Sequence, residues 1–174
     1  WPALWMLPVD DRYGGWAASG EIDLMEIVGE KPEEVLSSIH FGSTYPKRTL
    51  ITTTHALPKA SLVSDWHTYA VEWEPGEIRF FVDDVQTCTY RHWWSCSRLE
   101  NGMGVEAAGE ADLNPWPAPF DQPFYLVMNV AVGGNFPGAP NDETRFPAEL
   151  VVDYVRVYDK VGGYGPPKAR GPGV

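Results

Sequence analysis

Prolines and glycines interrupt this chain at short intervals and limit the length of any regular element. The sequence has 16 prolines and 17 glycines in 174 residues. Proline removes a backbone donor and glycine favours turns, so long helices and long strands are both disfavoured. No segment of useful length has apolar residues at helical spacing. This punctuation is typical of all-β sandwiches and barrels, in which short strands alternate with turns.

One hairpin can be predicted directly from alternating side chains. Residues 69–74 alternate between apolar and polar, and residues 78–82 are followed by Asp83 and Asp84. An Asp-Asp pair between two such runs is typical of a tight turn, from which residues 85–90 return as the partner strand. The pattern therefore predicts adjacent antiparallel strands.

Two further segments, 124–132 and 150–158, are strongly apolar, which is typical of strands buried on both faces. Together these patterns predict a single antiparallel β-sandwich domain over residues 1–161. Residues 162–174 are rich in glycine and proline and poor in residues that pack, so we expect a mobile C-terminal tail or a linker there.

A cluster of three carboxylates, Glu21, Asp23 and Glu26, is the strongest functional feature. In a regular strand Glu21 and Asp23 share a face and Glu26 lies on the other. A β-bulge near Met25 adds one residue and returns Glu26 to the face of Glu21 and Asp23. The opposite, buried face is then filled by Ile22, Leu24 and Ile27.

Such a bulged strand carries the groups that a retaining glycosidase needs, namely two carboxyls roughly 5–5.5 Å apart. We expect Glu21 to attack the anomeric carbon. Glu26, kept protonated by its neighbours' charge, would act as general acid and then general base, while Asp23 hydrogen-bonds Glu21. The alternative is a solvated acidic strand edge without catalytic function.

The chain resembles the laminarinase-like branch of glycoside hydrolase family 16. The matching motifs occur in family order: WPALWMLP (1–8), YGGW (13–16), SGEIDLME (19–26), SIHFG (38–42), WHTYAVEW (66–73), PFDQPF (119–124), NVAVGGN (129–135) and DYVRVY (153–158). The resemblance implies a β-jelly roll with a concave glycan-binding face. It assigns Glu21 as nucleophile, Glu26 as acid/base and Asp23 as the assisting group.

The implied activity is endo-hydrolysis of laminarin-type β-1,3-glucan, without a cofactor for catalysis. Two alternatives remain: a related hydrolase of mixed-linkage glucan, agarose or carrageenan, or a non-catalytic β-glucan-binding protein. The family's domain has further strands before its Trp-Pro-Ala segment, so we expect a missing or cleaved N-terminal segment of the same domain as a partner. Family members often bind a structural calcium, for which Asp153 is the matching residue.

The eight tryptophans indicate glycan binding, because flat aromatic rings stack on the apolar faces of sugars. By resemblance Trp16 forms a glucosyl platform, although it could instead pack a turn. Trp1 and Trp5 could line the cleft from the neighbouring strand or belong to the core.

Three more tryptophans are candidates for sugar binding. Trp93 and Trp94 are adjacent and cannot both point inward from a regular strand, so we expect one of them along the cleft. Trp116 lies between prolines and either binds sugar or packs a loop.

Three polar residues are also candidates for substrate binding. His40 is near the catalytic face by resemblance. Asn129 is a mid-strand Asn, which bonds within the core or faces the ligand. Asn135 follows two glycines and serves either a turn or a contact.

The net charge of −11 argues against nucleic acid as a partner, because nucleic acid requires a basic surface, and mildly against sulfated carrageenan. No apolar run is long enough for a membrane span. Cys88 and Cys96 either form a disulfide, which would suit the secreted, extracellular enzyme that we expect, or are two reduced thiols.

Overall fold

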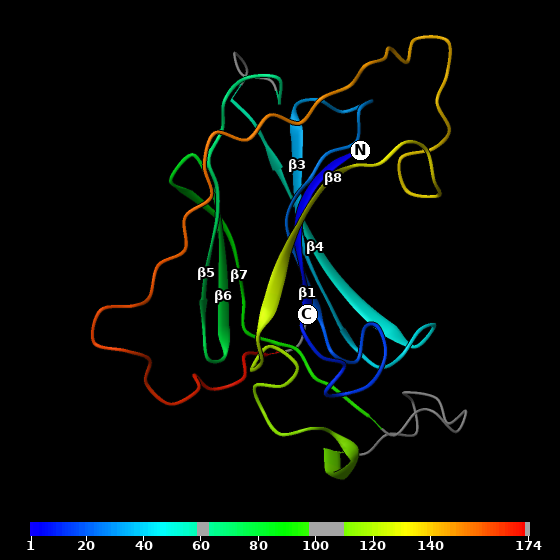
Figure 1. The fold of residues 1–174 in the computed structure, drawn as a ribbon. Helices are drawn as coiled ribbons and strands as arrows, with labels where there is room; N and C mark the ends of the chain where they lie inside the picture. The colour runs from blue at the N-terminus through cyan, green and yellow to red at the C-terminus, as the bar shows by residue number, and fades with distance from the viewer. Residues whose placement is uncertain (59–62, 98–109, 173–174) are drawn as a thin grey trace.

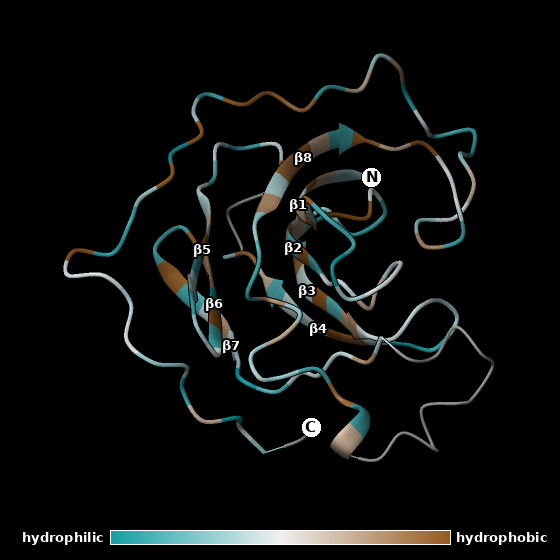
Figure 2. Cartoon of the chain, turned by 60° about the horizontal axis from the view of Figure 1, so that its bottom comes forward, coloured by the Kyte–Doolittle hydropathy of each residue, from teal (hydrophilic) through white to brown (hydrophobic). Residues whose placement is uncertain are grey.

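The computed structural model describes residues 1–58, 63–97 and 110–172 and contains two antiparallel sheets (Figure 1). The larger sheet has five strands in the order β4-β3-β2-β1-β8, which Figure 2 shows beside the smaller three-stranded sheet, β5-β6-β7. The strands of the larger sheet are β1 (Pro2–Pro8), β2 (Glu21–Glu26), β3 (Glu34–Gly42), β4 (Arg48–Ala56) and β8 (Phe124–Val130). The all-β prediction is confirmed.

The only helical element among the described residues is a 3₁₀ turn, η3 (Glu110–Asp112). The described part of the chain contains no helix that is long and apolar enough to cross a bilayer.

The smaller sheet contains the predicted hairpin. Its strands are β5 (Tyr69–Glu74), β6 (Glu77–Val82) and β7 (Val85–Tyr90), each antiparallel to the next. Asp83 and Asp84 connect β6 to β7 with φ values of 50° and 64°. Positive φ at both central residues is typical of a type I′ hairpin turn, and Asp tolerates it better than most residues.

The main core lies between the two sheets. Ile22 of β2 and Ile39 of β3 contribute from the larger sheet, and Ile78 and Phe80 of β6 from the smaller one; all four are at most 1% exposed. Because side chains alternate along a strand, this packing leaves the neighbours of Ile22 and Ile39 on the opposite face of the larger sheet. That face carries the candidate site.

The segment 124–132 was expected to be a strand buried on both faces, and this prediction is wrong in part. β8 ends at Val130 and is an edge strand, which among the described strands pairs only with β1. Tyr125 and Met128 are each nearly half exposed. Apolar composition alone does not distinguish a central strand from an edge strand, because that depends on which neighbours are present.

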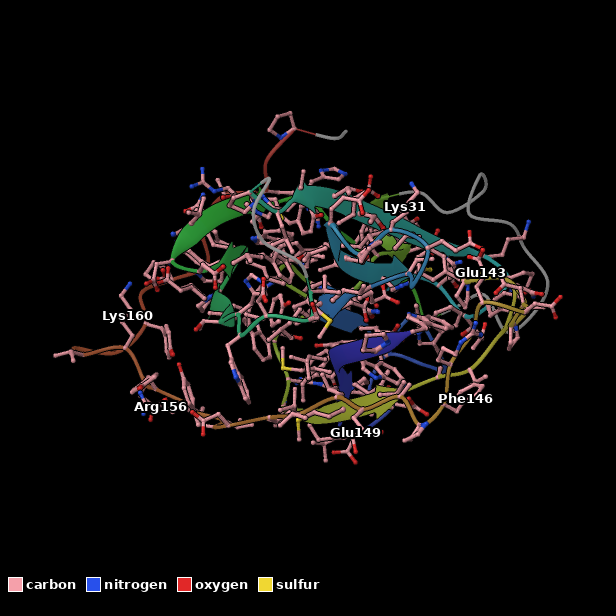
Figure 3. The ribbon with its side chains drawn as sticks, turned by 90° about the horizontal axis from the view of Figure 1, so that it is seen from above. Lys31, Glu143, Phe146, Glu149, Arg156 and Lys160 are labelled. Atoms are coloured by element: carbon pink, nitrogen blue, oxygen red, sulfur yellow. The ribbon has the colours of Figure 1, made fainter. Side chains whose placement is uncertain are left out.

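The prediction of a strand over residues 150–158 is also wrong. These residues have no strand assignment, and Val151, Val157 and Tyr158 are exposed. The physical reason is that a strand needs a hydrogen-bonding partner, and none of the described strands pairs with this segment. Figure 3 shows Arg156 of this segment, and Lys160 just after it, at the periphery of the molecule.

Part of the expected C-terminal tail is held against the smaller sheet. The backbone N–H of Lys168 donates to the Pro75 carbonyl (3.0 Å), and Gly171 donates to the Arg91 carbonyl (2.7 Å). The Lys168 ammonium also pairs with the buried carboxylate of Glu77. Glycine and proline content predicted an unpacked tail, because composition does not reveal backbone hydrogen bonds to distant residues. Residues 173–174 lie outside the described residues.

Candidate active site

The predicted bulge is present in β2. Against β1, Asp23 pairs with Trp5 and Met25 with Leu4, so one residue of β2 has no counterpart. Against β3, the register also shifts between Asp23 and Glu26. The extra residue reverses the parity of the strand, and Met25 joins the core at 1% exposure while Glu26 is only partly buried.

The bulge brings the three carboxylates to one face of the larger sheet, where they share neighbours. His40 lies opposite Glu21 on β3. Its Nε2 atom is 3.6 Å from Glu21 Oε1 and 3.3 Å from Asp23 Oδ2. Trp1 Nε1 donates to Glu26 Oε1 at 3.1 Å. The predicted grouping of Glu21, Asp23 and Glu26 therefore also includes Trp1 and His40.

Trp16 belongs to the same site through the loop that precedes β2. Its Nε1 donates to Glu21 Oε2, and its ring lies 5.4 Å from that of His40. The backbone of this loop is fixed to the loop after β3, where Tyr45 N–H donates to the Trp16 carbonyl (2.7 Å). Two loops far apart in sequence thus orient one indole over the carboxylates.

Gly20 allows this loop to enter β2 directly before Glu21. Its φ is +88°, and a Cβ placed there would lie 2.9 Å from a ring carbon of Phe120. Only glycine meets both conditions without strain or displacement. Gly20 therefore determines how Glu21 is presented.

Burial governs the protonation of the site. Loss of solvent, followed by the charge of Asp23, raises the pKa of Glu21 to about 7. Burial, with the charge of Glu26 next, raises the pKa of Asp23 well above its usual value. Burial lowers the pKa of His40, which favours the neutral imidazole.

The pKa of Glu26 is raised as predicted, but the cause differs from the expectation. Burial is the cause that raises it, whereas we expected the charge of neighbouring carboxylates. Hydrogen bonds from Trp1 and Ser38 and the charge of His40 act in the opposite direction. The pKa of Glu21 is raised too, so the three groups titrate as one coupled set.

A pocket of about 380 Å³ opens beside the nucleophile candidate and is lined by Trp5, Trp16, Glu21 and Tyr125, among others. Trp5 is held there by Asn129, whose Oδ1 accepts from Trp5 Nε1 at 2.7 Å. β1 and β8 are paired with Asn129 opposite Ala3, so the Trp5 side chain reaches Asn129 diagonally across the two strands. Asn129 thus acts on the pocket through Trp5.

Three tryptophans considered for binding lie elsewhere. Trp93 is fully buried, and its Nε1 donates to the Pro117 carbonyl at 2.8 Å. Trp94 packs edge-on against Phe41, on the core side of the larger sheet. Trp116 stacks on Trp93 at 4.7 Å. The expectation that Trp93 or Trp94 lies along the cleft is wrong, because this segment is irregular and both rings pack inward.

Two polar candidates also lie outside the carboxylate cluster. Asn135 is exposed in a turn, in a loop whose Phe136 contacts the ring of Trp1 at 5.3 Å. Asp153 is exposed, and it is not in the one group of three metal-ligating side chains found in the described residues. A calcium ion at Asp153 stays a prediction. Cys88 and Cys96 are free thiols.

Sequence reasoning missed Tyr45 and Arg48. Tyr45 is 67% exposed and stacks on Trp16 at 6.0 Å, and the Arg48 guanidinium lies 5.3 Å from the Trp16 ring centre. Tyr45 lies in the turn between β3 and β4, and Arg48 is the first residue of β4. No spacing relates them to β2, and only the fold of that turn brings them to Trp16.

Comparison with known proteins gives a consistent picture. The chain is 45% identical over 163 residues to "Glucan endo-1,3-beta-glucosidase A1" of Niallia circulans, covering 91% of this chain and 22% of that protein. It is 46% identical over 165 residues to "Beta-glucanase" of Rhodothermus marinus, covering 91% and 51%. The chain thus spans about a fifth and about half of the length of these two relatives.

The solved endo-β-1,3-glucanase of Pyrococcus furiosus superimposes with a TM-score of 0.64 at 32% identity, over 84% of this chain and 50% of that one. The sequence profile described as "Glycosyl hydrolases family 16" matches residues 1–96, which include the bulged β2 and its carboxylates. The chain belongs to glycosyl hydrolase family 16.

Proposed function

We propose that this protein is a secreted, endo-acting, retaining glycosidase that hydrolyses laminarin-type β-1,3-glucan. The observation that carries the proposal is the bulge in β2, which brings Glu21 and Glu26 to one face beside indole rings. The names of the Niallia circulans relative and of the Pyrococcus furiosus structure support a β-1,3-glucan substrate, and that of the Rhodothermus marinus relative supports a β-glucan. An extracellular location follows from the size of a polymeric substrate.

In the first step Glu21 attacks the anomeric carbon as a carboxylate. Trp16 donates to Oε2, which leaves Oε1 as the attacking oxygen. The nearby Asp23 shares a hydrogen bond with Glu21, and burial raises the pKa of Asp23 well above its usual value. The reaction needs the shared proton on Asp23. Glu21 is then ionised although the site is buried, which is the form that a nucleophile needs.

Glu26 supplies the proton for the leaving oxygen and later activates water. Trp1 donates to Glu26 Oε1, so the carboxylic proton belongs on Oε2. A raised pKa keeps Glu26 protonated closer to neutral pH than an exposed glutamate. The same group becomes the base for the second step, as double displacement requires.

The indole rings of Trp5 and Trp16 line the pocket next to Glu21 and offer flat surfaces for glucosyl rings. The net charge of −11 is compatible with a neutral glucan and unfavourable for a sulfated polymer. A binding protein without activity would not need the three carboxylates on one face, because burying them is costly.

The test is incubation of the protein with laminarin, lichenan, agarose and carrageenan, with products analysed by mass and by anomeric configuration. Oligosaccharides from laminarin that keep the β configuration are the expected result. Products only from another glycan would favour a related hydrolase. Laminarin binding without products would favour a glucan-binding protein.

A further inference from the structure

The side chains of Glu21, Asp23 and His40 place three metal-ligating atoms around one point. One ligand atom from each lies within 4.8 Å of the others. No other group of three His, Cys, Asp or Glu side chains in the described ranges has this property. We infer that these three residues form a binding site for a divalent transition-metal ion of the Zn²⁺ or Co²⁺ type.

The two distances from His40 agree with tetrahedral coordination, and the Glu21 and Asp23 oxygens lie within 4.8 Å of each other. Zinc bonds to imidazole nitrogen and carboxylate oxygen are about 2.0–2.2 Å, so two ligands of a tetrahedron lie about 3.3–3.6 Å apart. His40 Nε2 is 3.3 Å from Asp23 Oδ2 and 3.6 Å from Glu21 Oε1. His40 and each of the two carboxylates therefore lie at the spacing that one ion requires.

An independent observation points to a ligand at this position. Asp23 is 2% exposed, and its Oδ2 atom has no hydrogen-bond partner among the described residues. This same oxygen faces His40 Nε2. A buried carboxylate oxygen without a partner is costly, and either a proton or a cation would remove that cost.

The surroundings select the kind of ion. Trp16 Nε1 donates a hydrogen bond to Glu21 Oε2, and the other oxygen of this carboxylate, Oε1, faces His40. One nitrogen and two oxygens with an open fourth position suit zinc, whereas Ca²⁺ and Mg²⁺ prefer six or more oxygen ligands. His40 Nδ1 has no hydrogen-bond partner in the described part of the chain, so the outer hydrogen bond that strengthens structural zinc sites is missing there. The positive charge of Arg48, over the Trp16 ring, also opposes the ion. Binding should accordingly be reversible.

An ion at this site would occupy the oxygen with which Glu21 attacks and would block catalysis. This consequence rests on the proposed function, whereas metal binding itself does not. Zn²⁺ should inhibit laminarin hydrolysis, and a chelator should restore the full rate. Unchanged hydrolysis with the site saturated by Zn²⁺ would contradict a role of Glu21 as nucleophile but not the metal site.

The direct test is calorimetric titration of the whole chain with Zn²⁺, together with the visible absorption of bound Co²⁺, which is intense in tetrahedral sites. We expect one ion per chain. We expect Zn²⁺ affinity to fall at least about 10-fold in each of three variants: His40→Gln, Asp23→Asn and Glu21→Gln. Even groups that only orient the metal ligands cost about 10-fold or more when they are replaced. The matched control is His55→Gln, on β4 and outside the group, which should bind as the parent does.

Circular dichroism of each variant identifies those that fold, and one folded variant of the three is sufficient. Parent-like affinity in a folded His40→Gln or Asp23→Asn protein would overturn the inference, as would the absence of Zn²⁺ binding by the parent. Loss of Zn²⁺ binding in a folded variant, with no hydrolysis of any glycan by the parent, would support the metal site and refute the proposed function.

Discussion

The indole Nε1 of Trp16 donates a hydrogen bond to Oε2 of Glu21, across a loop that ends at a left-handed glycine. This contact links a residue suited to sugar stacking with the proposed nucleophile. It stabilises the ionised carboxylate and so lowers the pKa of Glu21, against the larger effect of burial. Trp16 therefore has an effect on acidity that can be separated from its effect on binding.

Replacing Trp16 by Phe should move the acidic limb of the kcat/KM profile to higher pH. With the pKa of Glu21 at about 7, activity falls as the pH drops and Glu21 becomes protonated. Removing the hydrogen bond raises this pKa further, so the loss begins at a higher pH. The measurement is kcat/KM on laminarin from pH 4 to 9, with Trp66→Phe, an exposed tryptophan, as control. An unmoved acidic limb would show that the contact does not control Glu21.

Replacing Trp1 by Phe should move the basic limb instead. The hydrogen bond from Trp1 lowers the pKa of Glu26. Without it Glu26 keeps its proton to higher pH, and the general acid remains active there. Both limbs of the pH profile report the coupled carboxylates together. The limb positions are therefore compared between variants and not with the pKa of a single residue. A shift confined to the acidic limb would reverse the roles of Glu21 and Glu26.

Gly20→Ala should destabilise the protein by about 1–3 kcal/mol, the usual cost of a strained backbone conformation, and more if Phe120 must move. The reasons are the φ of +88° and the 2.9 Å approach to Phe120. Gly29→Ala is the matched control, because a Cβ there meets nothing within 4 Å. It should change stability by less than about 1 kcal/mol. Urea unfolding measures both, and equal effects would contradict the argument.

Asn129→Ala should cost about 1–3 kcal/mol of stability if the Trp5 indole N–H is left without an acceptor. It should also raise KM, because Trp5 lines the pocket and loses its orientation. A double-mutant cycle with Trp5→Phe tests the coupling, since the Phe variant needs no acceptor. Fully additive effects would show that the 2.7 Å contact contributes nothing.

The sequence predicted the local features of the site well. The spacing of Glu21, Asp23 and Glu26 was sufficient to predict the bulge, because only an added residue places all three on one face. The turn at Asp83 and Asp84 could also be predicted, because it depends only on these residues and their neighbours in the sequence. Features determined within a few residues could be read without the fold.

Features that depend on distant partners could not be predicted. The apolar pattern of residues 150–158 resembles that of a strand, but pairing requires a neighbour that no pattern within the segment reveals. Adjacent tryptophans at 93 and 94 both pack inward because their backbone is irregular. Tyr45 and Arg48 reach Trp16 only through the contact between two loops.

The central claim is the division of roles between Glu21 and Glu26, and azide rescue tests it most directly. Glu21→Ala and Glu26→Ala should both lose activity on an aryl β-glucoside of laminari-oligosaccharide, and azide should restore turnover in each. We predict an inverted α-glycosyl azide from Glu21→Ala, because azide replaces the nucleophile. We predict a retained β-glycosyl azide from Glu26→Ala, because azide replaces water in the second step. The opposite pairing of variant and product would contradict the assignment, and so would rescue of neither.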